Sequence, residues 1–526
     1  MLHSALGLNG CVTAPHRLAA LAGRDALVAG GSAIEAMVAA AATIAVVYPH
    51  MNGLGGDAFW LIERPGEDPI GISGAGRAAA LADVARYKSR GYDAIPARGP
   101  DAALLVPGAV GSWQLALELV ERPRLALGDL LAPAVDYATR GCAATQSQAK
   151  MIAAKRDQLA SIEGFAGIFL PGGAPPAAGD RFMQPAMGEL LRQLAKEGLD
   201  SFYRGEIAAV HGRFLEAAGS PLRRADFADY RAERVTPLRL RTKAGTLFNM
   251  PPPTQGIASL LILGIFERLG ISEPEGFAHV HGLVEATKQA YRLRNRHLGD
   301  PRTMTEAPQS WLEAGRLDQL ATGVDMSKAR PWPEPAAQGD TIWMGAADAS
   351  GMVVSFIQSV FWEFGSGLTC PQTGIVFENR GAGFSLDPGP NQLAPGRQPF
   401  HTLNPALARL EDGRVMAYGT MGGEGQPQTQ SAVFTRYAVF GEGLQQAVTA
   451  PRWLLGKTWG DVNAKLKLES RFATEVVDGL RRAGHSLEVL GEFEDVMGHA
   501  GAVVRHPSGV FEGASDPRAD GAAIAF

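Results

Sequence analysis

The chain has 526 residues, of which 46% are hydrophobic and 64 are glycine, a composition typical of a folded protein with many turns. Its formal net charge of -5, with both signs interspersed, provides no basic face for a phosphate backbone, so nucleic-acid binding is not expected. Three cysteines far apart in the sequence indicate neither a disulfide framework nor a C-x-x-C metal site.

The first predicted elements are two helices within residues 15–47. Gly30 and Gly31 end the first helix, and Ser32 is the predicted N-cap of the second. The second helix is strongly apolar but contains Glu35, and it falls short of the roughly 20 apolar residues that a membrane span needs. We therefore expect a buried helix and no membrane association. The N-terminal residues lack a signal-peptide pattern, so the cytoplasm is the expected location.

The segment "NGLGGD" at residues 52–57 predicts a turn that enters a strand. A dinucleotide fingerprint would open a helix at this point, so no nucleotide site is expected. Helices then dominate to about residue 300, where Asp300 with Arg294 or Arg296 is expected to form a solvated helix end. His281 and Glu285 lie on one face of a predicted helix that also carries His279, but the sequence identifies no third metal ligand. A structural role is favoured, and neither a metal nor another cofactor is expected.

Residues 301–340 are rich in proline near their end and predict an extended, exposed segment. Short strands with Gly or Asp turns follow, which indicate antiparallel pairing. The predicted strands lie in "TIWMGAAD", "MVVSFIQSV", "GIVFEN", "PALARLEDGRVMAYGT", "SLEVLGEF" and "HAGAVVRHPSGVFEGASD". The sequence thus divides into a helix-rich part and a strand-rich part that meet just before Thr341.

The step Gly339-Asp340-Thr341 at this junction is ordinary turn chemistry when taken alone. If the bond between Asp340 and Thr341 were cut, however, Thr341 would hold a hydroxyl beside a free α-amine. Such an amine has a pKa of about 7.7 to 8.0, well below the roughly 10.4 of lysine, so it can serve as a base near neutral pH. Gly422 and Gly423 in "GTMGGEGQPQTQ" could supply backbone N–H groups to an oxyanion.

The chain resembles the γ-glutamyltranspeptidase family of N-terminal nucleophile hydrolases almost from end to end. Twelve stretches carry the resemblance in the family's order, and they are "APHRLAALAG", "AGGSAIEAMVAAA", "PHMNGLGGDAFWLI", "VPGAVGSWQLA", "LLAPAVDYATRG", "FYRGEIA", "MPPPTQGIASL", "EATKQAYRLRNRHLGDP", "GDTIW", "FGSG", "TGIVFEN" and "GTMGGEGQPQ". The resemblance implies an α+β fold, a four-layer αββα sandwich. It also implies a proenzyme that cleaves itself between Asp340 and Thr341. The products would be a large chain, residues 1–340, and a small chain, residues 341–526, which remain intertwined in one catalytic domain, with a dimer of these units as one option.

The resemblance also implies roles for individual residues. Thr341 is the expected nucleophile, Gly422 and Gly423 form the expected oxyanion turn, and Ser359 falls where the family keeps a threonine hydroxyl near the nucleophile. The family's glutamate-binding Arg-Glu-x-Ala-Pro motif is broken here to "AGRAA", and Arg77 is out of register by about two residues, so it is given no role.

Other departures concern the substrate. Phe361 replaces an asparagine, His401-Thr402 replace a pair of serines, and "ENRGAGFS" places Arg380 and Gly383 where the family has a polar side chain and an acid. The acid that would pair with a substrate ammonium is therefore lost. Arg380 and His401 are expected to form a cationic pair suited to a lone carboxylate, with Phe361 and Thr402 as further substrate-binding residues.

A short amide that carries a carboxylate fits this description, and within the family the pattern is most similar to the oxamate amidohydrolase branch. The expected reaction is hydrolysis of a substrate such as oxamate to oxalate and ammonia through an acyl-enzyme. Two alternatives within the family are a γ-glutamyltransferase or glutathione hydrolase and a glutaryl-type acylase. An alternative of another class is an unprocessed, inactive scaffold.

Overall fold

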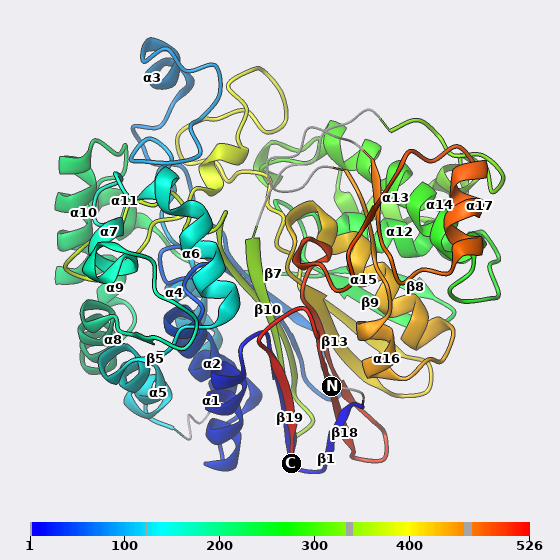
Figure 1. The fold of residues 1–526 in the computed structure, drawn as a ribbon, viewed down its shortest axis with the longest axis horizontal. Helices are drawn as coiled ribbons and strands as arrows, with labels where there is room; N and C mark the ends of the chain where they lie inside the picture. Colours follow the sequence, from blue (N-terminus) through cyan, green and yellow to red (C-terminus); the bar gives the residue numbers. More distant parts are fainter. Residues whose placement is uncertain (1–2, 122–124, 333–339, 457–464) are drawn as a thin grey trace.

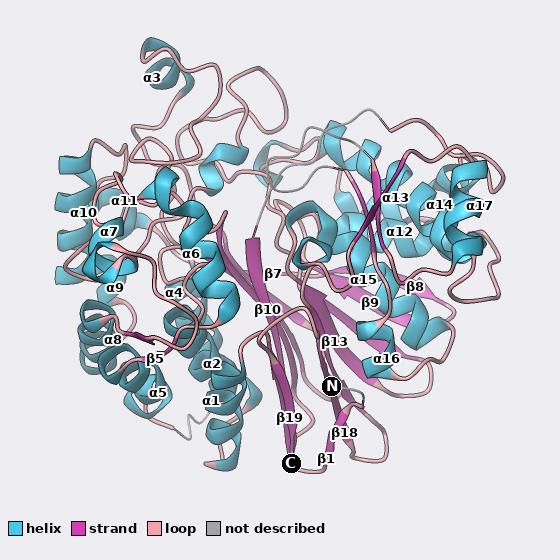
Figure 2. Ribbon diagram, viewed as in Figure 1, coloured by secondary structure: helices cyan, strands magenta, loops and turns pink. Residues whose placement is uncertain are grey.

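The computed structural model describes residues 3–121, 125–332, 340–456 and 465–526. Two seven-stranded sheets lie against each other at the centre of the molecule, and a layer of helices covers the outer face of each (Figure 1, Figure 2). The predicted αββα sandwich is therefore confirmed. Both termini lie at the lower edge of the central sheets in the view of Figure 1.

All neighbouring strands in the two large sheets are antiparallel. Sheet I has the order β19 (Ala522–Ala525), β2 (Gly10–Ala14), β10 (Asp340–Asp348), β11 (Val353–Phe361), β3 (Asp57–Glu63), β4 (Ile70–Gly74), β7 (Glu233–Val235). Sheet II has the order β1 (Ala5–Gly7), β18 (Phe511–Ser515), β17 (Ala500–Arg505), β13 (Val415–Thr420), β12 (Ala406–Leu410), β9 (Gly245–Asn249), β8 (Leu238–Thr242). Smaller sheets pair β5 (Cys142–Ala143) with β6 (Arg181–Phe182) and join β14 (Trp453–Leu455), β15 (Leu466–Glu469) and β16 (Leu487–Leu490). Each large sheet combines strands from both sides of Thr341, so neither side forms one of the two large sheets alone.

The helix layers differ in origin. The helices on the side of sheet I are α1 (Arg17–Val28), α2 (Ala33–Val47), α4 (Ala109–Leu117), α5 (Leu127–Arg140), α6 (Gln146–Leu159), α7 (Phe165–Phe169), α8 (Pro185–Glu197), α9 (Ser201–Arg204), α10 (Glu206–Ala218) and α11 (Arg224–Asp229), with α3 (Val84–Ser89) at the upper edge of Figure 1. Those on the side of sheet II are α12 (Gly256–Arg268), α13 (Phe277–His297), α14 (Ala314–Thr322), α15 (Gln426–Phe434), α16 (Leu444–Thr449) and α17 (Thr474–Arg482). The second layer therefore also draws on both sides of Thr341.

Helix α2 shows how the sequence fixes a local element. Ser32 is its N-cap, and a capping box forms because the Ser32 hydroxyl accepts from the Glu35 N–H while the Glu35 carboxylate accepts from the Ser32 N–H. Every residue of the helix is buried, since it packs between α1, α5 and sheet I. The two helices predicted within residues 15–47 are confirmed.

A separate apolar core fills the space between the two sheets. Trp343 of β10 lies in it, and the Trp343 indole N–H donates to Ser355 Oγ at 3.0 Å. A Cβ atom added to Gly419 of β13 would lie 2.1 Å from the Trp343 ring, so only glycine allows the sheets to approach there. This packing fixes β10, and with it Thr341, against the central strands β13 and β17 of sheet II.

Two predictions of local structure were wrong. "GIVFEN" at residues 374–379 is not a strand, because the N–H groups of Phe377, Glu378 and Asn379 bond to three different segments and form no ladder. Residues 301–332 are not uniformly extended and exposed, because they include α14 and the buried side chains of Trp311 and Leu317. The prolines at 333 and 335 lie outside the described residues.

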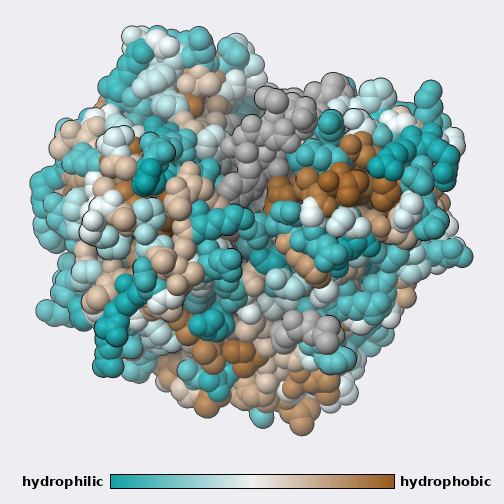
Figure 3. All heavy atoms as spheres, in the orientation of Figure 1, coloured by the Kyte–Doolittle hydropathy of each residue, from teal (hydrophilic) through white to brown (hydrophobic). Residues whose placement is uncertain are grey.

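The described residues include no helix that is long and apolar enough to cross a membrane. Polar and apolar residues are mixed over the face drawn in Figure 3, with one apolar area in the upper right of the view. Among the large hydrophobic side chains, Leu6 and Leu8 near the N-terminus are the most exposed of those described.

Candidate active site

Thr341 lies at an irregularity in the ladder between β10 and β11. Asp340 pairs with Phe361 and Ile342 pairs with Gln358, so Thr341 alone lies opposite two residues of β11, Ser359 and Val360. A bulge of this kind redirects side chains and is common beside active sites. Thr341 is fully buried, and the residue expected to carry the neighbouring hydroxyl, Ser359, lies across from it.

Phe361 connects this strand end to Arg380. Its φ of 80° lies in the left-handed region, which is strained for a residue with a side chain, and its N–H donates to Ser359 Oγ at 2.8 Å. The Arg380 guanidinium lies 3.5 Å from the centre of the Phe361 ring. Phe361 therefore connects the end of β11 to Arg380.

Arg380 is almost completely buried, and its Nη2 donates to Thr402 Oγ1 at 2.7 Å. Burial lowers the pKa of Arg380 to about 9, and the carboxyl groups of Glu378 and Asp57 oppose that shift. Because a guanidinium loses its proton so reluctantly, we treat Arg380 as charged. The structure thus brings together Arg380, Thr402 and Phe361, three of the predicted substrate-binding residues.

His401 differs from its expected role. Its Nε2 lies 2.9 Å from Asp57 Oδ2, and its Nδ1 accepts from the Leu403 N–H at 3.3 Å, so the proton is on Nε2 and Asp57 accepts from it. The pKa of His401 lies well below its usual value, mainly because the residue is buried and secondly because of the nearby charge of Arg380. The expectation of a cationic pair is corrected, because His401 is a neutral donor already engaged by Asp57.

The glycine turn lies directly after β13. Gly422 has a φ of 116° and Gly423 a φ of 53°, which explains the glycines at both positions. The hydrogen bonds found between described residues do not use the N–H of Gly422 or of Gly423. The turn leads into α15, where the helix N-terminus adds positive potential. Two such donors are what an oxyanion requires.

Gln255 connects the glycine turn to the Arg380 side of the site. Its Nε2 donates to the carbonyl of Thr402 and to the carbonyl of Gly423, each at 2.8 Å. Its Oε1 accepts from Arg294 Nη1 at 2.7 Å, and Arg294 also forms an ion pair with Glu424. Arg294 is therefore buried beside the turn, and Asp300 is buried as well, so the prediction of a solvated helix end is wrong for these two residues, whereas the alternative Arg296 is exposed.

Sequence reasoning missed five residues of this region, and they share one property: each meets its partner across a long stretch of chain. They are Asp57, Gln255, Arg294, Glu378 and Glu424. "NGLGGD" and "GIVFEN" already contained Asp57 and Glu378, and an acid beside a glycine-rich turn was the available signal. Arg77, in contrast, pairs with Glu233 and is partly exposed, consistent with its having been given no role.

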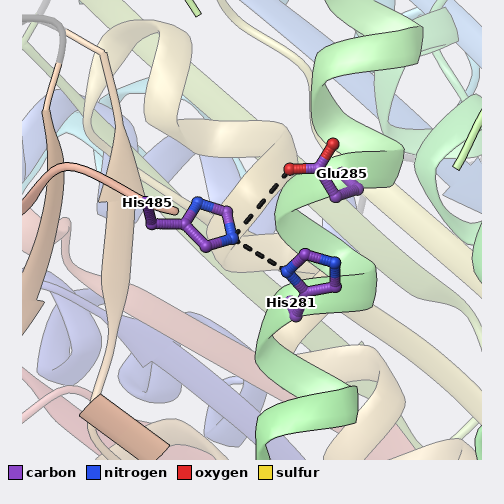
Figure 4. A group of neighbouring side chains, drawn as sticks. All are labelled: His281, Glu285 and His485. Atoms are coloured by element: carbon purple, nitrogen blue, oxygen red, sulfur yellow. Dashed lines mark hydrogen bonds and ion pairs between the residues drawn. The ribbon is translucent and has the colours of Figure 1, made fainter. Parts of the chain in front are cut away.

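A second polar group lies in the helix layer on sheet II and consists of His281, Glu285 and His485 (Figure 4). One ligand atom from each lies within 4.8 Å of the others, so the structure supplies the third group that the sequence did not identify. His281 Nε2 donates to the Asp325 carbonyl and His281 Nδ1 accepts from His485 Nε2, both at 2.8 Å. Lys288 Nζ lies 2.6 Å from Glu285 Oε1 and neutralises that carboxylate. Because the ammonium opposes a dication, we interpret the group as a buried hydrogen-bonded network.

Comparison with known proteins agrees with this architecture. The family model described as gamma-glutamyltranspeptidase matches residues 19–526. The oxamate amidohydrolase proenzyme of Klebsiella pneumoniae is 51% identical over 530 residues, and the glutathione hydrolase-like YwrD proenzyme of Bacillus subtilis is 39% identical over 528, with 100% of each chain covered in both cases. The crystal structure of a cephalosporin acylase from Bacillus halodurans superposes with a TM-score of 0.92 at 32% identity, covering 100% of this chain and 97% of that one. The chain is an enzyme that belongs to the γ-glutamyltranspeptidase family of N-terminal nucleophile hydrolases.

Proposed function

We propose that the protein cleaves itself between Asp340 and Thr341 and then hydrolyses the amide of a small carboxylate-bearing substrate such as oxamate. One observation carries the substrate class: Arg380 lies between the Phe361 ring and Thr402, and Gln255 connects the Thr402 carbonyl to the glycine turn. A carboxylate bound at Arg380 would thus have its adjacent amide between the end of β10 and that turn. The name of the Klebsiella relative supports the same chemistry.

The proposed reaction has two halves. The α-amine of Thr341 takes the proton from Oγ, and Oγ attacks the amide carbon while the N–H groups of Gly422 and Gly423 bind the oxyanion. The C–N bond then breaks, ammonia leaves with that proton, and an oxalyl ester remains on Thr341. Water hydrolyses the ester, releases oxalate and restores the hydroxyl. Ser359, opposite Thr341, is the proposed second hydroxyl near the nucleophile.

The competing γ-glutamyl substrates carry an ammonium that needs an acid. Near Arg380, Asp57 accepts from His401 and Glu424 is paired with Arg294, so neither is arranged for that role. Glutathione is therefore expected to be a poor substrate. Glutathione hydrolysis is nevertheless the second candidate reaction, because the Bacillus subtilis relative at 39% identity is named a glutathione hydrolase-like protein. Because the structure is similar to that of a cephalosporin acylase, a glutaryl-type amide is also one of the substrates to be tested.

The proposed large chain is residues 1–340 and the proposed small chain is residues 341–526. They would remain associated, because both large sheets contain strands from each. We propose the cytoplasm as the location, supported by the three buried free cysteines. A dimer of processed units stays a prediction.

The first test is intact-mass spectrometry of the purified protein, followed by turnover of oxamate, glutathione and a glutaryl amide. We expect two chains that meet at Asp340 and Thr341 and turnover of oxamate above the other two. Thr341→Ala should remain one folded, inactive chain. Turnover by that variant, or a single uncleaved chain in the wild type under all conditions, would contradict the proposal and favour the scaffold.

A further inference from the structure

Glu378 is a buried acid that has no role in the proposed reaction. It follows Phe377 in the irregular segment beneath the site, is 2% exposed, and is held through its N–H by the Gly55 carbonyl at 2.9 Å. Its carboxyl group lies beside that of Asp57, because Glu378 Oε1 is 3.1 Å from the position of a Cβ atom added to Gly76, and the Gly76 N–H donates to Asp57 Oδ1 at 2.9 Å. Glu378 Oε1 has no hydrogen-bond partner within the described part of the chain. Two buried carboxyl groups therefore lie close together, and both interact electrostatically with Arg380.

A hydrogen bond between two carboxyl groups requires a proton on one of them, and two ionised carboxylates in contact repel each other strongly. Asp57 is the better anion of the two. Its Oδ1 accepts from the N–H groups of Gly76 at 2.9 Å and Gly108 at 3.2 Å, and its Oδ2 accepts from His401. Glu378 Oε1 receives no such donor. The arrangement of donors thus favours the anion on Asp57 and the shared proton on Glu378.

The remaining groups around the pair carry little compensating charge. His401 is neutral, and the hydroxyls of Tyr203 and Tyr230, which also face the pair, are uncharged because burial raises the pKa of each. The charge of Glu424 raises the pKa of Arg380 slightly, but Glu424 itself forms an ion pair with Arg294. With Glu378 protonated, the charges of Arg380 and Asp57 cancel; with Glu378 ionised, the group has a net charge of about -1. An anionic substrate would then meet a negative site.

We propose that Glu378 is held as a neutral carboxylic acid that donates to Asp57, and that this state keeps Arg380 able to bind the carboxylate of the substrate. Glu378 is thereby a positioning residue that sets an alkaline limit on substrate binding. The inference rests on the proposed function for its substrate. Burial, reinforced by Asp57, raises the pKa of Glu378 well above its usual value, in agreement with this assignment.

The experiment compares wild type, Glu378→Gln and Glu378→Ala. Glutamine keeps the shape and an N–H donor for Asp57 but cannot ionise, whereas alanine leaves Asp57 without its donor. We expect KM for oxamate in the wild type to rise by about tenfold per pH unit above the pH at which Glu378 and Asp57 lose their shared proton. The rise should be absent in Glu378→Gln, which should also recover most of the kcat/KM lost in Glu378→Ala. The neutral diamide oxamide should show no such rise, and Glu492→Gln, at an exposed site, is the matched control.

A second measurement does not depend on any substrate. Infrared difference spectra at neutral pH should contain the C=O stretch of a protonated carboxyl group in the wild type, shifted by ¹³C-glutamate labelling and missing in Glu378→Gln. A label-insensitive or absent band, or an unchanged KM profile in Glu378→Gln, would overturn the proposal. If oxamate is not turned over but the band is present, the substrate assignment fails and the proton assignment stands.

Discussion

The guanidinium of Arg380 lies over the ring of Phe361 at 3.5 Å, and Phe361 is the residue that pairs with Asp340 at the start of β10. Phe361 thus contacts the proposed substrate anchor, Arg380, and also pairs with the residue at the proposed cleavage point, Asp340. Phe361 holds this position with a left-handed φ of 80°, a conformation that persists only where the surroundings enforce it. Specificity and nucleophile placement therefore depend on the same strand end.

Removing the anchor should affect charged substrates selectively. In Arg380→Ala we expect KM for oxamate to rise at least 30-fold, since truncating one partner of a buried charge pair costs about 2–5 kcal/mol. KM for oxamide, which has no carboxylate, should change far less. Arg380→Lys should recover little, because an ammonium cannot reproduce the planar stacking and fork geometry. Arg77→Ala is the matched control, and equal effects on both substrates would remove Arg380 from the anchor.

Gln255 should control the placement of the glycine turn. Gln255→Ala deletes the donors to the Thr402 and Gly423 carbonyls and leaves Arg294 without one of its acceptors. We expect kcat to fall by about tenfold or more, since small displacements of oxyanion donors are costly. The control is Gln445→Ala, because Gln445 makes a similar buried pair of bonds to Ser515 at a distant site. Similar losses of kcat in both variants would indicate a general effect on the fold.

His211 should make the folded state sensitive to acid. It is fully buried, its Nε2 lies 3.0 Å from Thr373 Oγ1, and burial lowers its pKa from 6.5 to about 3. A lowered histidine pKa contributes stability above pH 6.5 that is lost as the pH falls from there toward 3. The free energy of unfolding should thus decline between pH 6.5 and 4. In His211→Gln the slope should be smaller by up to about 1.4 kcal/mol per pH unit. Urea unfolding at each pH measures it, with His3→Gln as the surface control, and identical slopes would refute the assignment.

The group of His281, Glu285 and His485 gives a prediction about metals. His485→Ala leaves His281 Nδ1 without its donor, and we expect a loss of about 1–3 kcal/mol in stability. Because Lys288 already neutralises Glu285, the Tm of the wild type should be the same in EDTA and in added zinc. A rise of Tm with zinc that disappears in His485→Ala would instead establish a metal site.

The sequence by itself determined the elements whose signals are local. The capping box of Ser32 and Glu35, the turn before β3 and the hairpin of β12 and β13 follow from neighbouring residues, and the order of the motifs identified the family. Local periodicity also explains the error at "GIVFEN", since a short apolar run looks the same whether its N–H groups form a ladder or bond to separate segments.

Only the tertiary structure decided the charge states and partners at the site. His401 was expected to be cationic, but Asp57 lies 344 positions away in the sequence and reaches it because β3 is in sheet I. Burial then favours the neutral imidazole. The same reason applies to Glu378 beside Asp57, Gln255 beside Gly423 and His485 beside His281. Sheet order and register bring these groups together, and a pKa depends on which groups meet and how much water remains, which no local pattern specifies.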